Sequence, residues 1–133
     1  NGALAGLVSI TAEPLTPSLG AATLIGAVGG LIVVFSVPML DKFKIDDVVG
    51  AIPVHLFAGI WGTMVVPATN GDASYVTQFI SIVIVGVFVC ATAAIAWTIL
   101  KSTMGIRVGE EEEISGLDVS ELGMEAYPEF YKG

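Results

Sequence analysis

Long runs of uncharged, mostly apolar residues dominate this chain. Three stretches, residues 14–40, 48–71 and 73–100, contain no Asp, Glu, Lys or Arg. Each of them exceeds the roughly 20 residues that a helix needs to cross a bilayer. The pattern therefore predicts a membrane protein.

The same pattern predicts an all-α fold, a polytopic membrane helix bundle with a polar tail. The expected parts are a transmembrane region (1–104), made of the end of one span (1–12) and three full spans (near 18–40, 50–67 and 75–100), and an acidic tail (105–133). The first segment is too short to cross a bilayer and opens with Asn1 rather than Met. We therefore expect the chain to begin within a span of a longer protein, and we find no signal-peptide pattern.

The composition argues against several classes of function. Hydrophobic residues make up 54% of the chain and charged residues 14%, against about 25% in soluble proteins. A net charge of −8 argues against a nucleic-acid binder that works through a basic surface. Cys90, the single cysteine, lies in the third apolar stretch, so the sequence predicts a packing residue rather than a disulfide or a thiolate metal site.

The positive charges set the expected orientation. All of them lie between the first two full spans or after the third, namely Lys42, Lys44, Lys101, Arg107 and Lys132. These segments share one side if the spans alternate, and the positive-inside rule makes that side cytoplasmic. We therefore expect a cytoplasmic C-terminus, with the loops that carry Glu13 and Asp72 facing outward.

The tail changes character after Gly105. Its acidic run, from Glu110 to Glu113, is typical of a solvated and flexible segment. Apolar side chains from Ile114 to Tyr131 are interleaved with further acids, so the tail could instead dock on the cytoplasmic face or on a partner.

One titratable residue, His55, lies within the full spans. An ionisable side chain at membrane depth is costly and commonly marks an ion or proton pathway. On an α-helix Ala51 and Gly59 share its face, and such small residues would leave a narrow channel beside the imidazole, so both are candidate pore-lining residues. The alternative is a neutral histidine that is hydrogen-bonded to a neighbouring helix.

A neutral imidazole both donates and accepts a hydrogen bond. It could take a proton from a small cationic acid whose neutral form fits an apolar channel. A hydrated metal cation would instead need a ring of oxygen ligands. We expect neither a metal site nor a catalytic triad, because His55 has no companion ligand and no nucleophile at useful spacing.

At this point three segments resemble the Amt-type ammonium transporters of the Amt/Mep/Rh superfamily. Residues 1–12 resemble the signature N-G-x-L-A-G-L-V-x-I-T-A, and residues 45–62 resemble the block I-D-D-x-x-G-A-x-x-V-H…G-I-W-G. Residues 105–118 are similar to the cytoplasmic C-terminal region of these proteins. The Rh branch is a further possibility, although the G-I-W-G block and the tail favour Amt.

The resemblance implies an eleven-span homotrimer with one pore per subunit, in the plasma membrane (the inner membrane in bacteria). This chain would hold the end of the eighth span, the last three spans and the tail. His55 would be the second histidine of a pore pair that relays a proton while ammonium or ammonia crosses. The implied function needs no cofactor and is not enzymatic.

The resemblance also implies that the tail regulates the pore and receives PII-type signalling proteins. The tail positions that carry this expectation are Gly105, Arg107, Gly116, Asp118, Gly123 and Tyr127. Leu122 and Met124 replace a His and a Glu that the family commonly has, which puts partner docking in doubt. Asp46 and Asp47 match the family and either cap the start of the second full span or lie in a solvated turn.

Three functions from different classes remain. The leading one is an ammonium transporter subunit. The second is a sensor, in which ammonium occupancy signals through the tail. The third, a membrane enzyme or proton-coupled subunit with His55 as a relay, would require a cofactor or redox site, and the sequence has no motif for one.

Overall fold

A computed structural model describes residues 1–128, and these residues form helices joined by turns and loops, without a β-strand. Three helical segments are long and apolar enough to cross a membrane: Leu19–Lys42, Ile52–Thr69 and Tyr75–Thr103. The expected all-α architecture with three spans is therefore confirmed. The chain divides into two compact units, residues 1–89 and 90–133, which are described separately.

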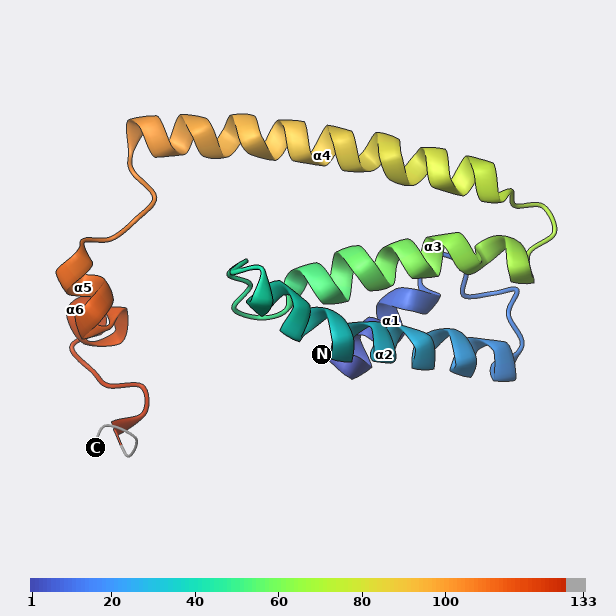
Figure 1. The fold of residues 1–133 in the computed structure, drawn as a ribbon, viewed down its shortest axis with the longest axis horizontal. Helices are drawn as coiled ribbons and strands as arrows, with labels where there is room; N and C mark the ends of the chain where they lie inside the picture. Colours follow the sequence, from blue (N-terminus) through green and yellow to red (C-terminus); the bar gives the residue numbers. More distant parts are fainter. Residues whose placement is uncertain (129–133) are drawn as a thin grey trace. The chain divides into compact units, whose positions relative to one another are not determined.

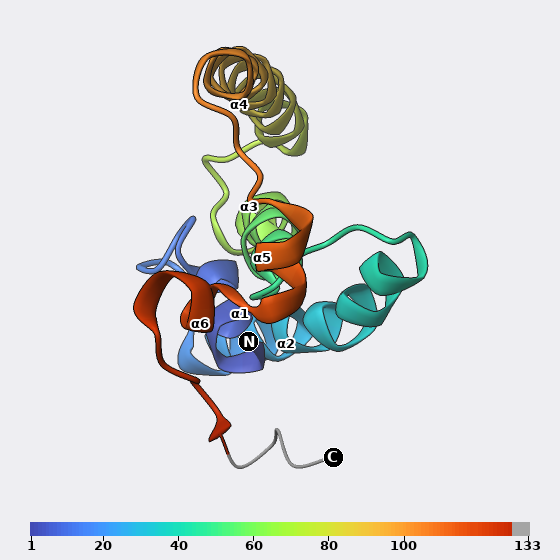
Figure 2. The ribbon, with the colours of Figure 1, turned by 90° about the vertical axis from the view of Figure 1, so that its left-hand side faces the viewer.

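The first unit is built around α1 (Gly2–Ile10), which packs against α2 (Leu19–Lys42), as Figures 1 and 2 show. The two helices approach closely at glycines. A Cβ on Gly6 would lie 3.4 Å from the Gly26 carbonyl oxygen, and a Cβ on Gly30 would lie 3.6 Å from the Gly2 oxygen. Helices in a bilayer pack through such close backbone approach, because lipid supplies no hydrophobic drive for their association.

Helix α2 begins at a serine cap and ends at the polar connector. Ser18 Oγ accepts a hydrogen bond of 3.2 Å from the Ala21 N–H, which satisfies one of the free donors of the first turn. The helix continues through Leu40, where the sequence predicted the span to end, as far as Lys42. Charged residues at the end of a span can stay helical, so the helix is longer than the apolar run that predicts it.

The second of the three spans has two parts, a π-helix η1 (Ile52–Phe57) and an α-helix α3 (Ala58–Thr69). It lies beside α1 and α2 (Figure 1). The core of the unit is formed where these helices meet, by Ala5, Val33, Val54 and Ala58, with Val8 and Val37 packed against it.

Helix α4 (Tyr75–Thr103) is the longest element, and none of its residues is buried. Cys90, expected to be a packing residue, is instead exposed. The reason is that no described residue covers the α4 surface on which it lies.

The second unit contains two short tail helices, α5 (Glu110–Ser115) and α6 (Leu117–Leu122), which contact each other. The acidic run that was predicted to be flexible is thus helical, although its side chains are exposed. A local cap explains the difference, because Glu112 Oε2 accepts a 3.0 Å hydrogen bond from the Gly109 N–H. Glu129, Phe130, Tyr131 and Lys132 lie outside the described residues.

Candidate functional site

His55 lies in the π-helix η1 rather than in the α-helix that the sequence predicted. In η1 the backbone closes wider turns, and the Ala58 N–H donates to the Pro53 carbonyl, five residues back. Proline has no N–H, so Pro53 fits near the start of this segment. Single π turns inside α-helices are rare and occur frequently at functional sites.

Asp47 caps the helix that carries His55. Its Oδ1 accepts from the Ala51 N–H at 2.8 Å and its Oδ2 accepts from the Ile52 N–H at 2.7 Å. Asp46, the other candidate for this role, is exposed. Both oxygens of one carboxylate therefore hold the first two free donors of the segment.

The backbone between the cap and η1 turns sharply at Gly50. Its φ is +75°, a left-handed conformation that suits glycine, and a Cβ there would lie 2.5 Å from Asn1 Nδ2. Asn1 Nδ2 in turn donates to the Val49 carbonyl at 3.0 Å. The start of α1 and the entry to η1 are thus joined.

The side chain of His55 is exposed, whereas Pro53 and Val54 are the buried residues of η1. Val54 is directed into the core, so His55 lies on the side that α1 and α2 leave uncovered. Ala51 is exposed as well. Gly59 is half-buried beside α1, where a Cβ would lie 3.8 Å from Val8 Cγ1. The three residues proposed to share one face therefore differ in exposure.

Ser9 of α1 lies at the junction between η1 and α3, and the sequence analysis did not identify it. It is 1% exposed, and its Oγ donates to the Ala5 carbonyl at 2.7 Å, with a longer contact of 3.4 Å to the Ala58 carbonyl. Gly29 leaves it no spare room, because a Cβ there would clash with Ser9 Oγ. A buried polar residue in an otherwise apolar helix was the signal that could have revealed it.

Aromatic residues near His55 pack toward α2. Trp61 Nε1 donates to the Ile25 carbonyl at 3.0 Å. Phe57 lines an open apolar groove of about 470 Å³, together with side chains of α2 that include Leu31, Phe35 and Met39. Trp61 and Phe57 are both half-buried.

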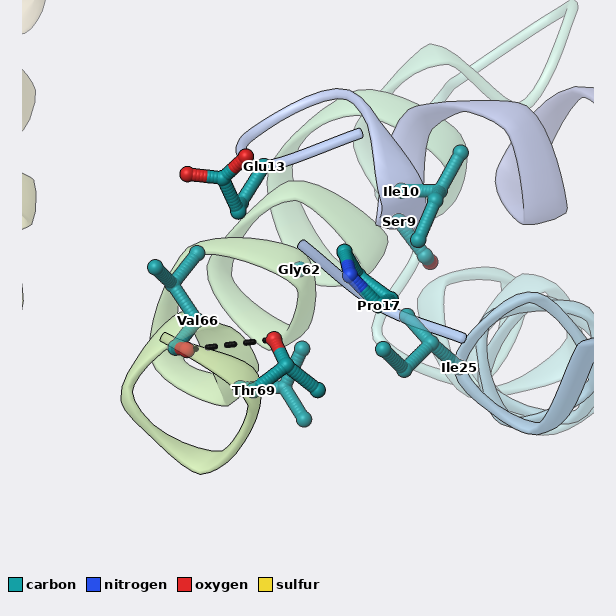
Figure 3. A pocket seen from close by; sticks show the side chains of 9 residues that line it. Ser9, Ile10, Glu13, Pro17, Ile25, Gly62, Val66 and Thr69 are labelled. Atoms are coloured by element: carbon teal, nitrogen blue, oxygen red, sulfur yellow. Dashed lines mark hydrogen bonds between the residues drawn. The ribbon is translucent and has the colours of Figure 1, made fainter. Parts of the chain in front are cut away.

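A shallow hollow lies at the opposite end of α3 (Figure 3). It is lined by Ser9, Ile10, Glu13, Pro17, Ile25, Gly62, Val65, Val66 and Thr69. Glu13 Oε2 accepts from Asn70 Nδ2 at 3.0 Å, and Glu13 Oε1 accepts from the Leu15 N–H at 3.2 Å. This carboxylate joins the loop after α1 to the loop after α3.

Asp118 organises the tail. Its Oδ2 accepts from the Ala126 N–H at 2.8 Å, and its Oδ1 accepts from the Val119 N–H at 2.9 Å. These two bonds hold the pKa of the carboxyl below its usual 3.8, and the bond to Ala126 has the larger effect. Gly123, with φ of +66°, lets the chain turn back after α6. The segment that follows α6 is therefore tied to the start of that helix.

The remaining tail candidates are two glycines, an arginine and a tyrosine. Gly105 and Gly116 have φ of +77° and +91°, so both occupy conformations that favour glycine. Arg107 forms an ion pair with Glu113 on the surface, with a closest distance of 2.6 Å. Tyr127 is 68% exposed.

The chemistry that these residues allow is hydrogen bonding and proton exchange at one imidazole. Within residues 1–128, no group of three His, Cys, Asp or Glu side chains could hold a metal ion. A neutral His55 can donate from one ring nitrogen and accept at the other. Its exposed position leaves it accessible from the side that α1 and α2 do not cover.

Comparisons with known proteins give the family. Residues 1–127 match the sequence profile of the Ammonium Transporter Family. The ammonium transporter Amt2 of Archaeoglobus fulgidus is 36% identical over 98% of this chain, and the ammonium transporter Amt1 of Haloferax mediterranei is 37% identical over 98% of it. The aligned regions make up 32% and 26% of these relatives, so the chain spans about a third of their length or less. This chain, a multi-pass membrane protein by its helices, belongs to the ammonium transporter family.

Proposed function

We propose that the protein of which this chain is a part transports ammonium or ammonia across a membrane, with His55 handling the proton. The single observation that carries the role of His55 is its placement: the histidine of the full spans lies on an exposed π turn with a capped start. The relatives are named as ammonium transporters, which supports the substrate.

In this proposal an ammonium ion reaches the pore and gives up a proton, since the neutral ammonia fits an apolar passage and the cation does not. The imidazole accepts this proton at one ring nitrogen and releases a proton from the other, so that the positive charge crosses together with the ammonia. Ala51 and Gly59 line the passage beside His55, because neither has a side chain larger than a methyl group.

We place residues 1–104 in the membrane and residues 105–133 as a cytoplasmic tail. The support is the charge pattern, with all positive residues on one side of the alternating spans. The assembly that we propose is a homotrimer in a plasma membrane, the inner membrane in bacteria. A PII-type signalling protein is the proposed partner of the tail.

The experiment measures ammonium-evoked current from the complete protein in proteoliposomes, with His55 intact and as His55→Ala. We expect a current in the first and its loss, or a loss of selectivity over potassium, in the second. Cys90→Ala is the control, because Cys90 is an exposed polar residue of another span. Absence of current from well-folded intact protein would contradict the transporter function.

A sensor is the second candidate, and the folded tail favours it. Helices α5 and α6 and the bonds of Asp118 form a small unit that a partner could recognise. If the protein is a sensor, ammonium changes the binding of a PII-type protein to the tail, and Asp118→Ala abolishes this response while the ammonium current persists. If it is a transporter without a sensing function, ammonium does not change this binding in the intact protein.

A further inference from the structure

The wide turn at His55 gives the histidine a direction that an α-helix would not. A π turn inserts one residue relative to the α-helical ladder, and one residue corresponds to about 100° of rotation about the axis. Whether this turn is π or α therefore decides which way the imidazole faces.

The far end of the turn is fixed by packing. Ala58 is 0% exposed and belongs to the core, and its carbonyl is the one that Ser9 Oγ approaches at 3.4 Å. Val54, 2% exposed, anchors the inner side of the turn. Rotation at this end would require core side chains to leave their contacts.

The near end is packed less tightly: Gly50 is buried beside Asn1 and Val37, but no side chain of residues 48–51 belongs to the core. Ala51 is exposed, and Val48 and Val49 before it are 89% and 70% exposed. The contacts that hold this end are hydrogen bonds, above all the two from Ala51 and Ile52 to the Asp47 carboxylate at 2.8 Å and 2.7 Å. Charge-assisted bonds of this length are among the stronger ones available to a helix terminus.

We propose that Asp47 is a positioning residue for His55, which keeps the π turn in register by holding both free N–H groups at its start. The proposal rests on the proposed function of His55 in proton handling. Asp47 contributes no group to the passage itself and acts through the backbone of residues 51–57.

The test uses the complete protein, reconstituted in lipid and labelled with ¹⁵N-histidine, as the wild type, Asp47→Ala and Asp47→Asn. The His55 ring signals are those that disappear in His55→Ala. The matched control is Ser18→Ala, which removes the cap of α2 and leaves the His55 segment alone. Ammonium-evoked current and its selectivity over potassium are measured on the same samples.

We expect Asp47→Ala to move the His55 ring signals and to change their dependence on pH, with current reduced on the order of tenfold or more, as displaced functional groups commonly cause. Asp47→Asn keeps one acceptor oxygen and should give a smaller change of the same kind. If Asp47→Ala does not fold, the His55 ring signals of Asp47→Asn, compared with those of the wild type, test the proposal. Ser18→Ala should leave the His55 signals where they are.

Unmoved His55 signals in a folded Asp47 variant would overturn the proposal, as would an equal movement in Ser18→Ala. These outcomes are independent of the transporter function, because the ring signals are read with or without current. A wild-type protein that carries no ammonium current contradicts the proposed function, and the ring signals still decide the role of Asp47.

Discussion

Ser9 of α1 lies directly against the backbone of Gly62 in α3, and a Cβ added to Gly62 would be 2.9 Å from the Ser9 Cα. Gly29 of α2 meets Ser9 from another side, where a Cβ would also lie 2.8 Å from the Ala5 carbonyl oxygen. Helix α1 is therefore enclosed by two glycines from two different helices.

The first prediction is that Gly62→Ala destabilises the protein by about 1–3 kcal/mol, the usual cost of overpacking. The clash is with backbone atoms, which cannot move aside as a flexible side chain can. Thermal unfolding of the purified complete protein measures it. Gly86→Ala is the control, since nothing lies within 4 Å of a Cβ there. Equal unfolding temperatures for the two variants would contradict the close contact at Ser9.

The second prediction concerns the indole of Trp61. Trp61→Phe removes the hydrogen bond to the Ile25 carbonyl and should cost about 0.5–1.5 kcal/mol, in addition to the lost ring area. Trp97→Phe is the matched control, because Trp97 is 58% exposed on α4. Thermal unfolding of both variants of the complete protein, followed by circular dichroism, compares them. A larger loss in the Trp97 variant would argue against the role of the Ile25 bond.

The third prediction is a coupling between Glu13 and Asn70, whose side chains bond at 3.0 Å across two loops. Glu13→Ala and Asn70→Ala should be non-additive by about 0.5–1.5 kcal/mol in a double-mutant cycle on unfolding. Asn70→Ala combined with Asp41→Ala, in the connector after α2, should be additive. Additivity in the Glu13 cycle would show that the bond adds nothing.

The fourth prediction is an acid transition of the tail at Asp118. The pKa of this carboxyl is lowered in the folded tail, chiefly by the Ala126 N–H, so the carboxylate stabilises the folded form. That contribution is complete above the ordinary pKa of 3.8 and is lost as the pH falls through the lower, folded value.

The amide signal of Ala126 in the complete protein, followed by NMR from pH 6 downward, reports this loss. We expect it to move at a pH below 3.8, the ordinary pKa of the group, and to be displaced already at neutral pH in Asp118→Asn. Glu121→Gln is the control on the same helix. An Ala126 signal that titrates above 3.8 would contradict the lowered pKa.

Much of the fold was predictable because the uncharged, apolar runs in the sequence are long. Three uncharged runs predict three helices, and each helix begins within two residues of the expected start. Gly6 and Gly26, which approach each other, stand in two stretches in which glycines recur four residues apart, residues 2–6 and 26–30. The helix ends were less predictable, since charged residues such as Lys42 continue the helix beyond the apolar run.

The details of the candidate site were less accessible. Hydrophobic pattern does not distinguish a π turn from an α turn over six residues, and Pro53 is compatible with both, so the direction of His55 could not be predicted. Ser9 was missed because the two glycines that pack against it, Gly29 and Gly62, are distant from it in the sequence. The helical form of the acidic run is accompanied by two local contacts, the Gly109 N–H bond to Glu112 and the Arg107–Glu113 ion pair, which a run of four glutamates in the sequence does not reveal.

The glycines and alanines around α1 also bear on the entropy of folding. Burying a glycine or alanine freezes no side-chain rotamer, whereas burying a long side chain costs up to about 2 kcal/mol of lost rotamer freedom. Helix α1 therefore gains van der Waals contact with α2 and α3 at almost no side-chain entropy cost. The penalty for ordering side chains grows with temperature, so heating should loosen the contacts of Trp61 and Phe57 before it separates α1 from its two neighbours.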